Sequence, residues 1–106
     1  MLELTNRRIA AETLNDLAAV HLRAGALRDA ITCYEGCLAC MREGGDRYGE
    51  ARTLADLAGV YVRVGRRKDA IDCYESAAAI LREQGDRRDG ARARRDLQVA
   101  MRDLGA

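Results

Sequence analysis

Polar and apolar positions alternate along this chain with a helical period, and the same pattern occurs twice. Residues 10–48 align with residues 50–88 without a gap, so that position 10 matches position 50. A period of about 20 to 50 residues is typical of a stacked solenoid, because each unit is too small to bury its own apolar face. The residues that recur in register are Leu14/Leu54, Leu17/Leu57, Ala18/Ala58, Gly25/Gly65, Ala30/Ala70, Tyr34/Tyr74 and Asp46/Asp86.

Apolar residues spaced by three and four positions predict two helices in each unit. In the first unit the two apolar stripes are Leu14, Leu17, Ala18, His21 and Leu22, and then Leu27, Ala30, Ile31, Tyr34, Cys37, Leu38 and Met41. In the second unit they are Ala51, Leu54, Leu57, Ala58 and Tyr61, and then Ala70, Ile71, Tyr74, Ala77 and Leu81.

Capping residues and glycines set the expected helix ends. Thr5 or Asn6 can cap the first helix and Asp46 the third, because short polar side chains accept the free N–H groups there. Gly25 and Gly65 suit the left-handed backbone that ends many helices. The turns after these glycines are short, so the two helices of a unit must pack antiparallel. Small residues, namely Ala18, Ala30, Ala58 and Ala70, are predicted at the crossing.

A fifth helix is predicted from Asp86, with Asp89 three residues later, to about Leu104. It repeats only half of the pattern. The residues expected to pack on the second unit are Ala91, Leu97, Met101 and Leu104, at the positions of Ala51, Leu57, Tyr61 and Val64. Arg94 and Gln98 stand where Leu54 and Ala58 stood, as expected for a terminal helix with a wettable outer face.

Composition agrees with an all-α protein, since the chain has no proline and its only aromatic residues are four tyrosines. A net charge of +1 over 106 residues gives no field that would attract nucleic acid or an acidic membrane. The sequence shows neither a signal peptide nor a long apolar run, so a soluble, cytoplasmic protein with reduced cysteines is expected. The fifth helix is basic, but its arginines lack interleaved aromatics, which favours a solvated cap.

These residues and spacings resemble the tetratricopeptide repeat family, in the longer variant that has a Gly-Asp pair at the start of each unit. Gly45-Asp46 and Gly85-Asp86 occupy those places. The resemblance implies an all-α, right-handed solenoid of helical hairpins that acts as a protein-protein interaction module. The single domain would span residues 1–106, with repeats at about 6–45 and 46–85 and a capping helix at about 86–104.

Aspartate recurs at one place in the first helix of each unit, as Asp16, Asp56 and Asp96. Stacking should bring these residues into a line on the inner curve, where relatives carry asparagines that grip a peptide backbone. Charged residues around this line predict a concave groove for an extended or helical segment of a partner. The candidate peptide-binding residues are Asn15, Asp16, Arg23, Arg52, Asp56, Arg63, Arg92, Arg95 and Asp96.

Three other interpretations stay open. Aspartates and arginines can simply pair within the stack, at about 0 to 1 kcal/mol for each exposed pair. The face around Ile9 has no earlier unit to cover it, which allows a homodimer or other self-assembly there. Cys33, Cys37 and Cys40 share one helical stripe and could make a metal or redox site with His21, although Ala77 and Ile80 in the second unit indicate packing positions.

Catalytic chemistry has no support in the sequence. No nucleophile, base and orienting acid converge, and Gly44-Gly45 lacks the Lys and Ser/Thr of a phosphate-binding loop. We therefore expect no enzyme activity, no cofactor and no metal, with a protein or peptide as the partner.

Overall fold

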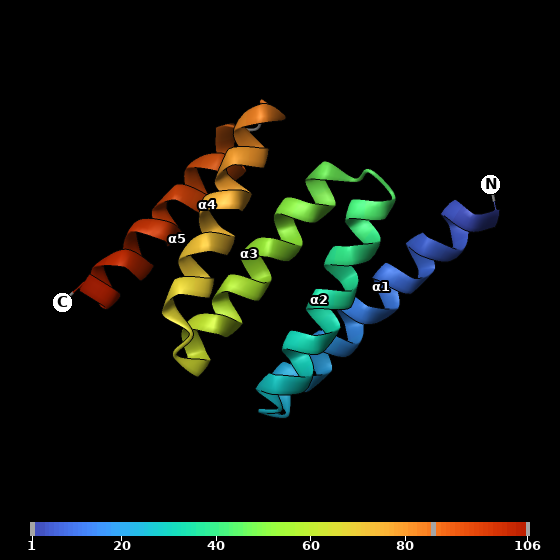
Figure 1. The fold of residues 1–106 in the computed structure, drawn as a ribbon, viewed down its shortest axis with the longest axis horizontal. Helices are drawn as coiled ribbons and strands as arrows, with labels where there is room; N and C mark the ends of the chain where they lie inside the picture. Colours follow the sequence, from blue (N-terminus) through green and yellow to red (C-terminus); the bar gives the residue numbers. More distant parts are fainter. Residues whose placement is uncertain (1, 86, 106) are drawn as a thin grey trace.

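Five helices make up the part of the chain that the structure describes. The computed structural model describes residues 2–85 and 87–105, and the side chains among them except those of residues 2–5, 87–89, 93, 100 and 103–105. The helices are α1 (Leu2–Arg23), α2 (Leu27–Glu43), α3 (Arg47–Val64), α4 (Arg67–Glu83) and α5 (Arg87–Gly105). Each follows the previous one in an antiparallel zigzag (Figure 1). The predicted all-α helical-hairpin fold is confirmed.

Glycines and one aspartate fix the helix ends as the sequence predicted. Gly25 and Gly65 adopt positive φ angles of 78° and 81°, and after Gly65 the N–H of Arg66 bonds back to the Tyr61 carbonyl at 2.9 Å. The Asp46 side chain accepts a hydrogen bond of 2.8 Å from the Gly49 N–H and so caps α3.

The predicted start of α1 is wrong. Neither Thr5 nor Asn6 caps this helix, because it already begins at Leu2 and both residues lie inside it. Two glycines, which disfavour helix, directly precede Asp46, whereas Leu4 and Thr5 directly precede Asn6, so the helix can continue through this position. Asp86 and the side chain of Asp89, expected to start α5, lie outside the described residues.

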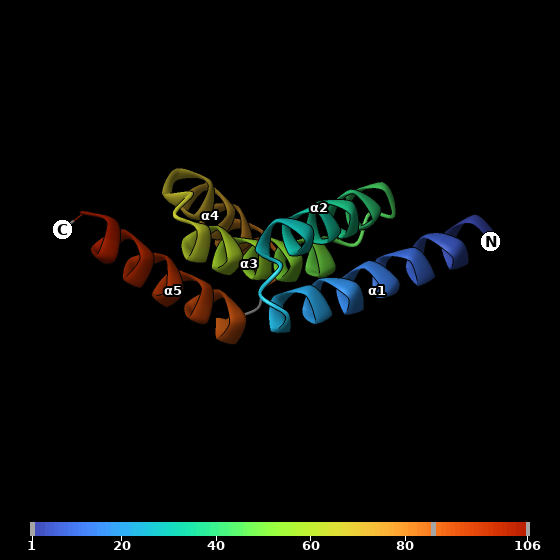
Figure 2. The ribbon, with the colours of Figure 1, turned by 90° about the horizontal axis from the view of Figure 1, so that it is seen from below.

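The helices stack into a flat body with principal extents of 49 × 35 × 18 Å. Seen from below, α2 and α4 lie on one side, α1 and α5 lie on the other, and α3 runs through the middle of the stack (Figure 2). The extensive packing follows chain order: α1 on α2, α2 on α3, α3 on α4 and α4 on α5. Because α3 has a packed neighbour on two sides, it holds the centre of the core.

The alanines predicted at the helix crossing lie in the core. Ala18, Ala30, Ala58 and Ala70 are all completely buried. The predicted apolar stripe of α3 is buried in full, and Val60 adds a further residue that is only 2% exposed. In α4 the outcome is mixed, because Ala70, Ala77 and Leu81 are buried whereas Ile71 and Tyr74 are half-buried. Small side chains at the crossing thus allow close helix packing.

Two edges of the stack depart from the prediction. Leu17 of α1 is 44% exposed, because the side of α1 on which it lies has no helix against it. In α5 the prediction is wrong for Ala91 and Met101, which are exposed, while Leu97 is half-buried. Gly90 is buried instead, and a Cβ there would lie 3.7 Å from the Leu81 side chain, so α5 turns Gly90 rather than Ala91 toward α4. The C-terminal end of α5 lies away from α4 (Figure 1), which leaves Met101 in solvent. The side chain of Leu104 lies outside the described residues.

Ion pairs repeat with the same offset as the core. Arg7 pairs with Glu43 at 3.6 Å, and Arg47 pairs with Glu83 at 2.7 Å, so each pair ties the first helix of a unit to the end of its second helix. We call these two contacts the unit straps. Glu50 is a buried carboxylate that receives both Arg42 of α2 and Arg47 of α3. A buried charge needs such partners, and the pair with Arg42 links the two units.

Candidate peptide-binding groove

One face of α3 lines a cleft that opens between α3 and α5. The spacing of three and four residues places the α3 lining on a single helical side, which continues from Tyr48 to Gly59. Arg52 and Asp56 are the charged members and stand one turn apart. The residues of α3 in the cleft are Tyr48, Ala51, Arg52, Ala55, Asp56 and Gly59.

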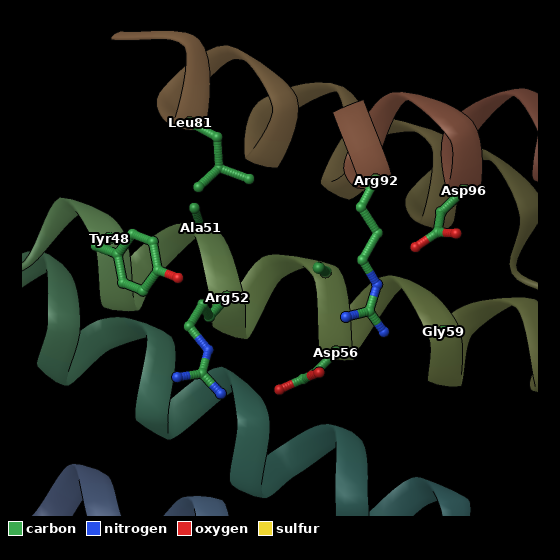
Figure 3. Close-up of a pocket in the computed structure, with 9 residues that line it drawn as sticks. Tyr48, Ala51, Arg52, Asp56, Gly59, Leu81, Arg92 and Asp96 are labelled. Atoms are coloured by element: carbon green, nitrogen blue, oxygen red, sulfur yellow. The ribbon is translucent and has the colours of Figure 1, made fainter. Parts of the chain in front are cut away.

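The opposite wall comes from α5, which carries the same pair of charges one repeat later. Arg92 and Asp96 line the cleft from α5, and Leu81 of α4 closes it at one end. The cleft has a volume of about 610 Å³, enough for several side chains of a bound segment. Figure 3 shows Arg52 and Arg92 on either side of Asp56, with Tyr48 and Leu81 farther along the cleft. We call this cleft the α3–α5 groove.

Asp56 is the electrostatic centre of the groove. Burial by the surrounding protein raises the pKa of its carboxyl, and the nearby charges of Arg52 and Arg92 oppose this rise. Among the described residues, no nitrogen of either arginine lies within 4.0 Å of a carboxylate oxygen of Asp56. The Asp56 side chain keeps an exposed surface in the groove and has no direct ion pair, so its carboxylate is open to a bound segment.

Tyr74 of α4 lies next to the groove. Its hydroxyl stands 3.9 Å from the place that a Cβ on Gly59 would occupy. Burial raises the pKa of Tyr74, and the negative charges of Asp96 and Asp56 raise it further. The phenol stays neutral at physiological pH and retains its hydrogen-bond donor close to the two carboxylates.

Four of the nine predicted residues come together in the groove, namely Arg52, Asp56, Arg92 and Asp96. The other five do not line it: Asn15, Asp16, Arg23, Arg63 and Arg95. The predicted line of aspartates therefore joins Asp56 to Asp96 within one cleft, and Asp16 stays outside it on α1. Binding by any of these residues stays a prediction.

Sequence reasoning missed the apolar part of the groove. Repetition of charge revealed Arg52 and Asp56, but Tyr48 and Gly59 have no counterpart of the same type at positions 8 and 19 or 88 and 99. A helical projection of α3 would have revealed them, since they share one side with Asp56. Leu81 carries no such signal, because it belongs to the neighbouring helix of the hairpin.

The cysteine stripe behaves as packing. Cys37 is completely buried, and its sulfur lies 3.6 Å from the Thr53 hydroxyl of α3. Burial raises the pKa of Cys37 and, together with nearby acidic charges, that of Cys73 to about 11, so both thiols stay protonated at neutral pH. In the part of the chain that the structure describes, no three side chains of His, Cys, Asp or Glu are grouped to hold a metal ion.

No described helix combines the length and the apolar character needed to cross a bilayer.

Comparison with known proteins gives one family: a model of the tetratricopeptide repeat matches residues 9–83, which comprise most of α1 and all of α2, α3 and α4. No curated protein matches the chain.

Proposed function

The chain belongs to the tetratricopeptide repeat family, and we propose that it binds a segment of a partner protein in the α3–α5 groove. Repeats of this family are non-enzymatic scaffolds that generally mediate protein-protein interactions. The family supports this class of function, and the charged lining supports the choice of the α3–α5 groove as the site. The free cysteines suit a reducing compartment such as the cytoplasm.

The observation that carries the proposal is the state of Asp56. Asp56 is an exposed carboxylate that lines the groove and lacks a direct ion pair, so it can accept a charge-assisted hydrogen bond from a bound segment. Arg52 and Arg92 flank it as donors without a close acceptor among the described ion pairs. The groove thus offers acceptor and donor groups side by side.

These groups specify the chemistry of the partner. Asp56 and Asp96 accept hydrogen bonds from backbone N–H groups or from a basic side chain. Arg52 and Arg92 donate hydrogen bonds to a carboxylate or a backbone carbonyl. Tyr48 and Ala55, which line the groove and keep exposed surface, receive an apolar side chain. The segment that fits has an apolar residue followed by neighbouring basic and acidic residues.

A random peptide library displayed on phage tests this proposal. Binders selected on the full chain should weaken on Asp56→Asn by about 1 to 3 kcal/mol, or roughly 5- to 150-fold, the scale of a lost charge-assisted hydrogen bond. Calorimetric titration of a synthetic copy of one selected peptide measures the change.

Asp72→Asn is the matched control, because Asp72 is an exposed aspartate of α4 that does not line the groove. The control should keep the affinity of the unaltered chain. Selected peptides that bind the Asp56 variant and the unaltered chain equally well would show that recognition lies elsewhere on the molecule.

A further inference from the structure

A continuous apolar stripe runs along α1 on the side that no helix covers. Ile9, Leu17 and Val20 are 55%, 44% and 51% exposed. Ala10 and Thr13 lie between them at helical spacing and are also exposed. We call this set the α1 stripe: Ile9, Ala10, Thr13, Leu17 and Val20. Its large apolar members share one side of a single helix, which is unlike scattered surface leucines.

The internal repeat shows what such a stripe does when it is covered. The equivalent residues of α3 face α2: Glu50 pairs with Arg42 at 3.0 Å, and Thr53 contacts the Cys37 sulfur at 3.6 Å. Leu57 and Val60, at the positions of Leu17 and Val20, are each only 2% exposed. The same positions thus form a helix-packing interface in one unit and lie open in the other.

Two residues of the α1 stripe differ from α3 in a way that bears on its occupant. A Cβ on Gly49 would stand 2.5 Å from the Met41 sulfur, so glycine makes room for α2. Ile9 fills this room in α1, and Ala10 replaces Glu50, the acid that holds Arg42. A helix packed as α2 packs on α3 would therefore meet a bulky side chain and lose its ion pair.

We infer that the α1 stripe packs against the α1 stripe of a second copy of this chain, antiparallel about a twofold axis level with residue 15. In this register Ala10 faces Val20 of the other copy, and Thr13 faces Leu17. Each smaller residue meets a larger one, which is how packed helices interdigitate. The contact is isologous, as expected for a closed dimer.

Charge also favours this occupant. The stripe contains no charged residue, so two copies can join without burying an unpaired charge. Arg7 and Arg8 near it are already matched by Glu43 and Glu12, each at 3.6 Å. A net charge of +1 for the whole chain leaves little repulsion between copies.

Sedimentation equilibrium over a concentration series tests the dimer. The unaltered chain should sediment as a dimer, and Val20→Asp should raise the dissociation constant at least about 100-fold by placing a charge in the contact. Val99→Asp is the matched control, because Val99 is 48% exposed on α5, close to the 51% of Val20. The control should retain the dimer, and circular dichroism should show equal helicity in all three proteins.

A swap of residue sizes tests the register without introducing charge. Ala10→Val alone and Val20→Ala alone should each weaken the dimer about tenfold, and the double variant should return to within about threefold of the unaltered chain, since it restores one large residue opposite one small residue. A monomer at all concentrations up to about 1 mM overturns the inference, and so does a dimer that Val20→Asp leaves intact. Peptide affinity at the α3–α5 groove should be the same in Val20→Asp, so that failure of one proposal leaves the other standing.

Discussion

α1 and α3 occupy the same place in successive units, yet they have different surroundings. Leu57 is 2% exposed in α3, whereas Leu17 at the same position of α1 is 44% exposed; for Val60 and Val20 the values are 2% and 51%. Ala58 and Ala18 are completely buried in both helices. The alanine faces the partner helix within its own hairpin, while the leucine and valine need a helix from another unit. Whether a residue is buried in a repeat protein therefore depends on its position in the unit and on the presence of a neighbouring unit.

The largest difference between the two helices is expected on deleting a leucine side chain. Leu57→Ala should cost about 2 to 5 kcal/mol of unfolding free energy, because it opens a cavity between packed helices. Leu17→Ala should cost less than about 1 kcal/mol in the monomer, since the leucine is already half in solvent. Urea denaturation below the concentration at which copies associate measures both. Equal costs would show that α1 is covered as fully as α3.

Overpacking the crossing should give the next largest effect. Ala58→Leu should cost about 1 to 3 kcal/mol, because the residue is completely buried where α3 has packed neighbours on both sides. Ala18→Leu should cost about half as much, since α1 is held by α2 on one side and can shift toward solvent. Thermal midpoints compare the two variants. An unchanged midpoint for Ala58→Leu would contradict the assignment of the crossing.

α1 and α3 also differ in the capping of their first turns. Asp46→Ala should cost about 0.5 to 2 kcal/mol, because the Gly49 N–H loses the acceptor at 2.8 Å. Asn6→Ala, at the equivalent position of α1, should be neutral or slightly stabilising, since Asn6 lies inside a helix where alanine is preferred. The same denaturation series measures both, and a costly Asn6→Ala would place the real start of α1 there.

The smallest effect concerns the groove aspartate and depends on pH. Burial raises the pKa of Asp56 above its ordinary value of 3.8, so the folded protein keeps this proton at pH values where the unfolded chain has lost it. The contribution of Asp56 to stability is therefore fully present below pH 3.8 and is lost as the pH rises through the pKa of the folded state. Asp56→Asn should then slightly raise the thermal midpoint at pH 7, and the gain should shrink as the solution is acidified.

Asp16→Asn is the control for that series, because Asp16 has the same repeat position in α1 but lies outside the groove. It should change the unfolding free energy by less than about 0.5 kcal/mol at either pH. If Asp56→Asn instead lowered the midpoint at pH 7, the carboxylate would be a stabilising member of an ion pair, and the groove would have no free acceptor at that place.

Periodicity and turn residues predicted the hairpins well, because helix formation and helix ends are determined by residues that are close together in the sequence. Gly65 and Asp46 end and begin their helices as predicted. Leu17 was misjudged, since its sequence surroundings match those of Leu57 and nothing local reports a missing neighbour. The predicted burial of Met101 was wrong for a related reason, because the tilt of α5 relative to α4 depends on packing along the whole helix.

The groove could be predicted only where charge recurs. Asp56 and Asp96 stand at the same position of successive units, so their convergence followed from the stack. The position of Arg92 opposite Asp56 could not be predicted in this way, because it depends on the distance between α3 and α5, which are not consecutive helices. Arg92 and Asp96 are four residues apart on α5, the spacing of a helical ion pair, yet no pair between them lies within 4.0 Å among the described ion pairs.

The unit straps constrain how the length of this chain can change. Arg7 and Glu43 are separated in sequence by the same interval as Arg47 and Glu83, and each strap closes around one whole hairpin. Insertion of one whole unit at the turn after Glu43 would add a complete hairpin with its own strap and leave both existing straps intact. Insertion of half a unit inside a hairpin would separate a strap and place a helix in the wrong direction. Insertions inside this stack should therefore be tolerated in steps of one whole unit, whereas a single helix such as α5 can be added at an end without opening a strap.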